Sequence, residues 1–564
     1  MSMNQTDNDG KARLDDMTQG VLGEPLPRID GLAKVTGMAR YAAEYPIDNC
    51  AEGVLVTSTI THGTVTRLDT EAALAMPGVI AVIDDSRLTT RAAQGTANEA
   101  PQQAPVTVCY WGQPIALVVA ESFEQARDAA KRIVVEYDVS PSPPLAPGDV
   151  TPEEQEDDTV SEGDLEHAMK DAAHSVDVEI MTKGHASAAM EPHAAIADWD
   201  GERLTVHASL QMLNYNISEL ADALDLPEEK VRLVARYVGG GFGSKLGISQ
   251  DVVAASLASI KLKRPVRVVL SRQQVFQCVM RRSETTQRLR LAATSDGKLI
   301  GFGHEALVSN LPGEEFCEPV LQSSHFMYRG ENRELMLNLA RIHRMTAGSV
   351  RAPGEAVGMP ALEAAMDMLA EKSGVDPVAL RLMNIPDKNP ESSLPFSSHK
   401  LAECLRQGAE AFGWDGGPRK ARQRREGEWW IGTGMASGAR IHSTKESKAR
   451  VTLLADGTAR IETDMTDIGT GLHDPCPNGR RDARYRSCDG AGGHWRHAPP
   501  PGPRIGRKLG CGFDRLGGLP RLPRDPRRPR CAGRVGRGCA RIARWQGRRR
   551  SQADRCSRRR QPIP

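Results

Sequence analysis

The sequence predicts an α+β protein of several domains, and three observations lead to this class. Apolar runs of strand length are interspersed with helices that carry one apolar face. With 564 residues, the chain is long enough for three or four domains. A proline-rich segment at 140–149, extended by an acidic segment at 151–164, separates the first domain from the rest.

The first domain is predicted over residues 25–145, after a flexible leader at 1–24. Its apolar runs predict four strands, and a helix of one apolar face is predicted at 123–133 with a shorter helix at 71–76. The predicted strands are 54–60, 78–84, 115–119 and 133–139.

The second domain is predicted over residues 165–390 and mixes strands with helices in the same way. Its predicted strands are 176–181, 204–209, 231–238, 266–270, 287–293 and 299–308. Its predicted helices are 217–224, 249–261, 361–372 and 376–382, of which the last is initiated by a proline.

The third region, at 395–471, reads as the incomplete start of a further domain. A helix is predicted at 401–411, a strand at 429–439 and a hairpin at 449–467. The hairpin has an Asp456-Gly457 turn between alternating apolar residues. One hairpin is too little to bury a face alone.

The composition changes abruptly after residue 471. The last 93 residues contain 24 Arg, 1 Lys, 6 Asp and no Glu, a formal charge of +19, against −18 for residues 1–471. A nucleic-acid-binding tail, a disordered arm and an out-of-frame translation of GC-rich DNA are three interpretations. The absence of Glu, with scattered Cys and Trp, favours a frameshift and an aberrant, disordered tail.

The remaining composition excludes several classes of protein. No run of 18 apolar residues predicts a membrane span, and the polar N-terminus has neither a signal-peptide core nor a twin arginine. Cys50, Cys109, Cys278, Cys317 and Cys404 are far apart and form no CxxC pair, so an iron–sulfur or zinc site is not expected on residues 1–471. An aromatic content of 4% argues against a base-stacking surface and against nucleic acid as a partner.

The strongest local motif is GGGFGSK at 239–245, between a predicted strand and a predicted helix. Its glycines permit positive φ and a close approach of backbone to an anionic ligand. The order of residues fits neither a P-loop nor a dinucleotide fingerprint. A tight turn against a packed sheet and a ligand-facing loop around Phe242 are both open.

Three further segments are candidate binding elements. Arg351, in the loop 348–360, is either a surface ion-pair donor or a rigid donor to a phosphate or pterin. Arg440 ends a predicted strand, so it faces either a ligand or solvent. The loop 467–471 could bind an anion through its N–H groups and the Thr470 hydroxyl.

His185, Glu191 and His193 form a loose set of metal-ligating side chains. Their spacing fits no zinc motif, so core histidines are the favoured interpretation and a metal site the alternative. No GxSxG elbow occurs.

Taken in order, several segments resemble the molybdenum-binding large subunit of the xanthine dehydrogenase/aldehyde oxidase family. The resemblance is greatest to bacterial aldehyde oxidoreductases that use molybdopterin cytosine dinucleotide. The segments that carry it are 23–45, 58–63, 110–130, 188–200, 239–245, 350–367 and 466–471.

The resemblance implies an N-terminal hammerhead α/β domain followed by molybdopterin-binding domains. It implies oxidation of aldehydes to carboxylic acids with water as the oxygen source. Molybdenum would be held through the pterin dithiolene and by no protein ligand. The implied cofactor-binding residues are Gln211, Gly241, Phe242, Arg351, Ile468, Gly469 and Thr470. Arg440 would orient the substrate.

One departure bears on the substrate. Purine-oxidising members carry Glu directly after the glycine motif, where this chain has Leu246. The resemblance therefore favours an aldehyde, and a purine or other N-heterocycle is the alternative. Because no iron–sulfur cluster or FAD is expected on this chain, separate iron–sulfur and FAD subunits are the expected partners. They could also bring an export signal, so the location is cytoplasmic, or periplasmic by co-export.

The larger departure lies after Gly471. Family members continue with a long cofactor-binding domain, near whose end a glutamate acts as the general base. Residues 472–564 contain no glutamate, so this base is not present in the chain. We therefore expect the 564-residue chain to retain no molybdenum and to be inactive. Two alternatives remain: a non-enzymatic protein that binds nucleic acid through the basic tail, and a truncated subunit that still docks the iron–sulfur partner through the hammerhead region.

Overall fold

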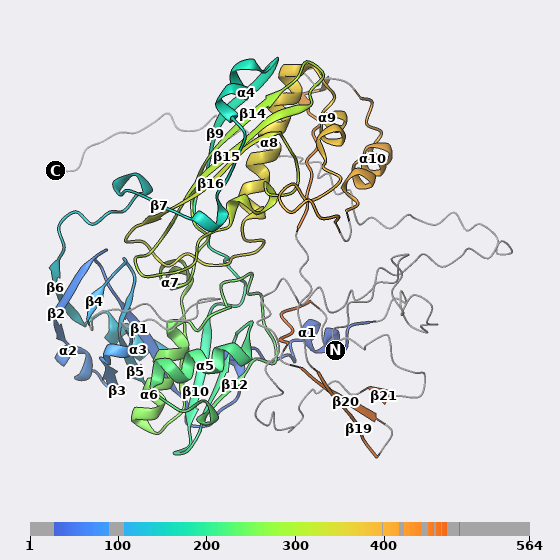
Figure 1. Ribbon diagram of the computed structural model, residues 1–564. Coiled ribbons are helices and arrows are strands. Elements are labelled where there is room, and N and C mark those ends of the chain that lie inside the picture. The colour runs from blue at the N-terminus through green and yellow to red at the C-terminus, as the bar shows by residue number, and fades with distance from the viewer. Residues whose placement is uncertain are drawn as a thin grey trace.

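A computed structural model describes residues 27–88, 106–396, 399–416, 422, 424–440, 449–455, 458–463, 465–470 and 484–485. The leader predicted at 1–24, the Asp456-Gly457 turn and nearly all of the tail 472–564 lie outside the described residues. The described part is a mixture of helices and sheets, which confirms the α+β class (Figure 1).

A seven-stranded sheet joins the N-terminal region to the second region of the chain. Its strand order is β12-β11-β10-β13-β1-β5-β3. The bounds are β1 Ala51–Thr57, β3 Val79–Ile83, β5 Pro114–Ala120, β10 Ala194–Trp199, β11 Leu204–Ala208, β12 Val231–Val234 and β13 Val266–Val269. β1 pairs with β13 in parallel, with Ala51 opposite Val266. The backbone of residues 51–120 is therefore part of the same sheet as that of residues 194–269.

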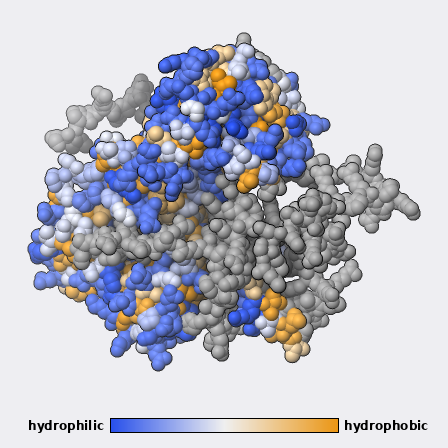
Figure 2. Space-filling model, viewed as in Figure 1, coloured by the Kyte–Doolittle hydropathy of each residue, from blue (hydrophilic) through white to orange (hydrophobic). Residues whose placement is uncertain are grey.

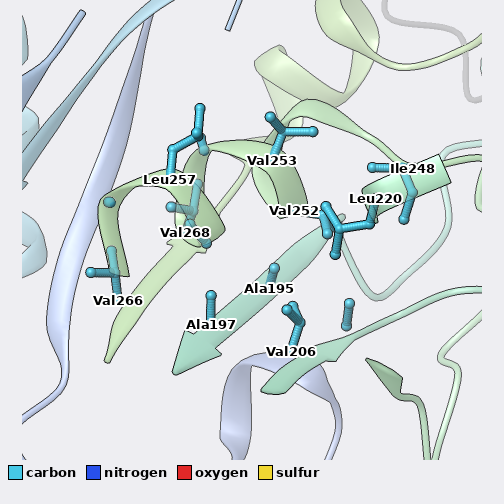
Figure 3. Close-up of a cluster of buried hydrophobic side chains, with 14 of the residues drawn as sticks. Ala195, Ala197, Val206, Leu220, Ile248, Val252, Val253, Leu257, Val266 and Val268 are labelled. Carbon is cyan, nitrogen blue, oxygen red and sulfur yellow. The ribbon is translucent and has the colours of Figure 1, made fainter. Parts of the chain in front are cut away.

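A large hydrophobic core lies between the seven-stranded sheet and two helices, α5 (Leu213–Leu224) and α6 (Gln250–Leu262). α6 is apolar around most of its circumference, as expected for a buried helix. Figure 3 shows Leu257 of α6 beside Val268 of β13, and Val252 of α6 beside Leu220 of α5. This packing fixes the loop that leads into α6, at residues 239–249.

The N-terminal region also contains a three-stranded sheet of order β4-β2-β6 (Figure 1). Its strands are β2 Gly63–Asp69, β4 Thr107–Val108 and β6 Val134–Val139, and its helices are α2 Glu71–Leu74 and α3 Phe123–Ala130. The Ser122 hydroxyl caps α3 by accepting a 3.3 Å hydrogen bond from the N–H of Gln125.

The other large sheet has the order β7-β16-β15-β14-β9, with β8 paired to β16. Its bounds are β7 Glu153–Glu154, β8 Val160–Glu162, β9 His174–Thr182, β14 Thr285–Ala293, β15 Leu299–Asn310 and β16 Asn332–Arg341. The long helix α8 (Glu355–Ser373) packs against β9 and β14, and α4 (Leu165–Asp171) packs against β14, β15 and β16. Figure 1 shows α8 lying along this sheet.

The remaining elements are short. They are α1 Gly31–Val35, α7 Arg272–Cys278, α9 Pro377–Asn384, α10 Leu401–Phe412, β17 Arg424–Glu426, β18 Trp429–Ile431, β19 Arg450–Leu453, β20 Thr458–Glu462 and β21 Arg484–Tyr485. The hairpin predicted at 449–467 is confirmed as β19 and β20, with Val451 opposite Ile461. Val451 and Leu453 are exposed, and Figure 2 shows this apolar patch at the lower right.

Several predicted elements were wrong in extent. The strand predicted at 231–238 ends at Val234, and the helix predicted at 217–224 begins at Leu213. The strand predicted at 429–439 ends at Ile431, because Gly432, Gly434 and Gly438 interrupt the apolar run. The helix predicted from 361 begins at Glu355, so that Pro360 lies inside it. The strands β2, β10 and β16 were not predicted.

Among the described helices, none combines the length and the apolar character needed to cross a bilayer. The five described cysteines are free thiols. Neither observation identifies a site.

Candidate functional site

The glycine loop, residues 239–245, connects β12 to α6 through a strained backbone. Gly240 and Gly243 have φ of +98° and +103°, and Phe242 has φ of +55°, which a bulky side chain rarely adopts. Strained residues of this kind persist only where the surroundings fix them, and they cluster at ligand-binding loops.

Two of the glycines are required by close contacts. A Cβ at Gly241 would lie 2.2 Å from Oε1 of Gln211, and one at Gly243 would lie 2.0 Å from the carbonyl oxygen of Ser349. The loop is therefore packed between Gln211 and a second loop, with no room for side chains at these two positions.

Gln211 has one end of its amide fixed and the other end available. Its Oε1 accepts hydrogen bonds from the N–H groups of Gly243 (3.0 Å) and Lys245 (3.4 Å). Its Nε2 is buried and has no hydrogen-bond partner among the described residues. A buried donor without a partner is costly, so it is a natural place for an acceptor supplied by a ligand.

The second loop, residues 349–354, is called here the arginine loop because it carries Arg351. The N–H of Arg351 donates a 2.7 Å hydrogen bond to the carbonyl oxygen of Phe242. Ala352 has φ of +54°, so this loop is strained as well. The Arg351 side chain is exposed.

A buried ion pair holds the arginine loop in place. The guanidinium of Arg282 lies 2.6 Å from Oε1 of Glu318 and donates to the carbonyl oxygens of Val350 (2.8 Å) and Arg351. The same Glu318 oxygen accepts from the N–H of Gly354 at 2.7 Å. Burial raises the pKa of Glu318 from its usual value.

Arg440 is joined to the same loop through the first residue of α8. Its Nη1 lies 2.8 Å from Oε2 of Glu355, which is almost fully buried, whereas the Arg440 side chain is 36% exposed. The backbone just before Arg440 is held by the N–H of Ser437, which donates to Glu363 at 2.6 Å. Arg440 is thus an ion-paired arginine next to the arginine loop.

The loop that carries Ile468, Gly469 and Thr470 is organised by Asp467. One carboxylate oxygen of Asp467 accepts from the N–H groups of Gly469 (2.7 Å) and Thr470 (3.0 Å). The carbonyl oxygen of Gly469 accepts from Arg28 at 3.2 Å. These hydrogen bonds join the loop to the N-terminal segment.

The set His185, Glu191 and His193 does not form a metal site. No cluster of three metal-ligating side chains occurs in the described part of the chain. His193 is buried, its Nε2 lies 3.0 Å from the carbonyl oxygen of Ser244, and burial lowers its pKa to about 3. Glu191 instead pairs with Lys245 at 3.0 Å, a contact that the spacing of the motif did not predict.

An apolar cluster adjoins both loops. Leu246, which directly follows the glycine loop, packs with Met212 and Met280, and Tyr215 packs against them. Met280 also touches the segment before the arginine loop, because a Cβ at Gly348 would meet its sulfur. The surroundings of Leu246 therefore suit an apolar group.

Two protein-family models match the chain. The aldehyde oxidase and xanthine dehydrogenase a/b hammerhead domain matches residues 36–141. The molybdopterin cofactor-binding domain matches residues 149–385. These ranges contain Gln211, the glycine loop and the arginine loop.

Individual relatives agree with these matches. The chain is 42% identical over 461 residues to the aldehyde oxidoreductase molybdenum-binding subunit PaoC of Escherichia coli (strain K12), covering 80% of this chain and 62% of that protein. It is 28% identical over 480 residues to the xanthine dehydrogenase molybdenum-binding subunit of Escherichia coli O157:H7, covering 79% and 63%. The chain thus spans about three fifths of the length of these relatives.

Solved structures show the same fold. The aldehyde oxidoreductase of Desulfovibrio gigas superposes with a TM-score of 0.66 at 24% identity, covering 77% of this chain and 51% of that one. The quinoline 2-oxidoreductase of Pseudomonas putida 86 superposes with a TM-score of 0.71 at 18% identity, covering 84% and 67%.

Proposed function

Because the chain belongs to the aldehyde oxidase and xanthine dehydrogenase family of molybdopterin-binding proteins, we propose that it is built as the molybdenum-binding subunit of an aldehyde oxidoreductase. The reaction would convert aldehydes to carboxylic acids with water as the oxygen source. The 42% identity to an aldehyde oxidoreductase subunit supports this assignment over the more distant xanthine dehydrogenase subunit.

The observation that carries the proposal is the unpartnered Nε2 of Gln211 beside the glycine loop. A buried amide donor, a loop without a side chain at Gly241 and an exposed arginine at 351, whose backbone binds that loop, fit an anionic pterin cofactor. Gln211, Gly241, Phe242 and Arg351 would hold its molybdenum-bearing part. We assign Ile468, Gly469 and Thr470 to the nucleotide part of a cytosine dinucleotide form.

When bound, the molybdenum cofactor supplies the two-electron oxidation of the substrate carbon. The chain's own residues then orient the reactants. Gln211 would donate a hydrogen bond to the cofactor, and Arg440, whose guanidinium Glu355 holds in position, would orient the substrate. Leu246 offers an apolar wall, which suits an aldehyde better than a purine.

We propose that residues 472–564 take no part in catalysis. Residues 472–564 contain no glutamate, so they cannot supply the family's general base. We also propose that electrons leave through separate iron–sulfur and FAD subunits.

A chimera tests the substrate class. Residues 1–471 would be joined to the part of the Escherichia coli K12 relative that lies beyond the matched residues and produced with that relative's partner subunits. The proposal predicts a kcat/KM for an aromatic aldehyde at least about tenfold above that for xanthine. A preference for xanthine would contradict it, and the 564-residue chain, which lacks the joined part, is assayed beside it.

A further inference from the structure

We propose that Glu191 and Lys245 form a positioning pair that holds both ends of the glycine loop, so that the Gln211 amide presents its Nε2 to the cofactor. The cofactor part of this inference rests on the proposed function. The geometry of the loop does not depend on it.

Glu191 binds the beginning of the loop. Its Oε2 accepts a 2.7 Å hydrogen bond from the N–H of Gly239, and its own N–H donates to the carbonyl oxygen of Gly239 at 3.2 Å. A Cβ at Gly239 would lie 2.5 Å from the Cβ of Glu191. The first residue of the loop is therefore held on both sides of its peptide group.

Lys245 is the last residue of the loop and binds the same glutamate. Its side chain is fully buried, and its Nζ lies 3.0 Å from Oε2 and 3.1 Å from the carbonyl oxygen of Glu191. A third contact, of 2.9 Å, goes to the hydroxyl of Ser209. The three donors of the ammonium group thus have three acceptors.

The pair reaches Gln211 through the backbone of Lys245. The N–H of Gln211 donates to the carbonyl oxygen of Lys245 at 2.8 Å, and the N–H of Lys245 donates back to Oε1 of Gln211. These bonds require an oxygen on the side of the amide that faces the loop. The amide nitrogen is therefore the donor that has no partner among the described residues. A displacement of Lys245 would remove one of the bonds that fix the orientation of the Gln211 amide.

A role in positioning explains the pair better than a role in stability. A buried ion pair pays for its desolvation and often contributes little more than an apolar pair would. Its bonds here converge on a loop whose Phe242 is strained, and a strained loop needs such restraints. Glu191 also accepts from the N–H of Ala42 at 3.3 Å, which ties the N-terminal segment to the same point.

Hydrogen–deuterium exchange of the full 564-residue chain tests the inference. The double variant E191Q/K245M removes both charges together, so no unpaired charge stays buried. We expect the amides of 239–246 to exchange about tenfold faster than in the wild type, while those of β14 and β15 are unchanged. The single variant E191Q leaves the ammonium group of Lys245 buried without its counter-charge, so it should raise the exchange of 239–246 at least as much.

The matched control is E363Q/R381M, which removes the charges of another buried ion pair, at 2.8 Å, between α8 and α9. It should leave the exchange of 239–246 unchanged. Unchanged exchange of that loop in folded E191Q/K245M would overturn the inference. Faster exchange throughout β14 and β15 in both Glu191 variants would also overturn it, because the pair would then be a stability element.

The exchange experiment separates this inference from the proposed function. It needs no cofactor, so a failure of the chain to bind pterin would count against the proposed function and leave the loop result intact.

Discussion

The N–H of Arg351 donates a 2.7 Å hydrogen bond to the carbonyl oxygen of Phe242, which joins two loops that are more than a hundred residues apart in the chain. One loop leaves the seven-stranded sheet and the other enters α8. The junction therefore lies between the seven-stranded sheet and α8, beside Gln211, whose Nε2 has no hydrogen-bond partner in the part of the chain that the structure describes.

The contact between the two loops predicts a large cost for a methyl group at Gly243. The Cβ would lie 2.0 Å from the carbonyl oxygen of Ser349, at a φ of +103°. Gly243→Ala should lower the free energy of unfolding by about 3 kcal/mol or more. Gly374→Ala, at a φ of +70° with open space around it, should cost about 1 kcal/mol. Urea unfolding of both variants compares them, and equal losses would contradict the packing described.

The buried pair Arg282 and Glu318 should matter more than an exposed pair. Arg282→Met leaves the Glu318 carboxylate buried without its partner and frees the carbonyls of the arginine loop. We expect a loss of about 3–5 kcal/mol in the free energy of unfolding. Arg288→Met removes a half-exposed pair with Asp177 and should cost less than about 1 kcal/mol. Similar costs for the two substitutions would contradict the role of the Arg282–Glu318 pair in holding the arginine loop.

A buried carboxyl group near the glycine loop predicts a pH dependence of stability. Burial raises the pKa of Glu219 to about 8 from its usual 4.5, although Asn216 and the N–H of Ile248 donate to it. Between pH 4.5 and about pH 8, the folded state therefore binds more protons at this group than the unfolded state does. This contribution to stability is therefore fully present below pH 4.5 and is lost as the pH rises through about 8.

Glu219→Gln removes that titration while keeping an oxygen acceptor. Over this range it should remove a slope of up to about 1.4 kcal/mol per pH unit from the free energy of unfolding. Chemical unfolding at pH 5 and pH 8 measures the slope. Parallel pH profiles for the wild type and the variant would show that Glu219 is ionised in the folded protein.

Leu246 predicts substrate preference. Leu246→Glu in the chimera places a carboxyl group among Met212 and Met280, so it should reduce kcat/KM for aldehydes by about tenfold or more. Turnover of xanthine relative to the aldehyde should rise. Leu246→Met conserves the volume and is the control, and steady-state rates with both substrates decide the outcome. An unchanged ratio would remove Leu246 from the account of specificity.

The sequence located much of the fold because many of its elements have local signals. The hairpin of β19 and β20 follows from alternation, and the helix α3 follows from its one apolar face. β10 was missed, and so was the pairing of β1 with β13, which joins Ala51 to Val266 across more than two hundred residues. No local pattern encodes such a pairing.

The candidate site, too, could be predicted from the sequence only in part. The motif at 239–245 is visible in the sequence, and the structure places it beside Gln211 and Arg351. The partners that hold it are not visible, since Glu191 lies 54 residues before Lys245. Glu191 had only a metal-site interpretation in the sequence, because its pairing depends on how β10 and β11 lie against the loop.

The most direct test of the central claim is the molybdenum content of two purified proteins from the same host. The chimera of residues 1–471 with the relative's remaining part should contain near-stoichiometric molybdenum and pterin. The 564-residue chain should contain little of either. A chimera without molybdenum would contradict the assignment of Gln211 and the two loops to the cofactor. Stoichiometric molybdenum on the 564-residue chain would contradict the expectation that residues 472–564 do not complete the cofactor site.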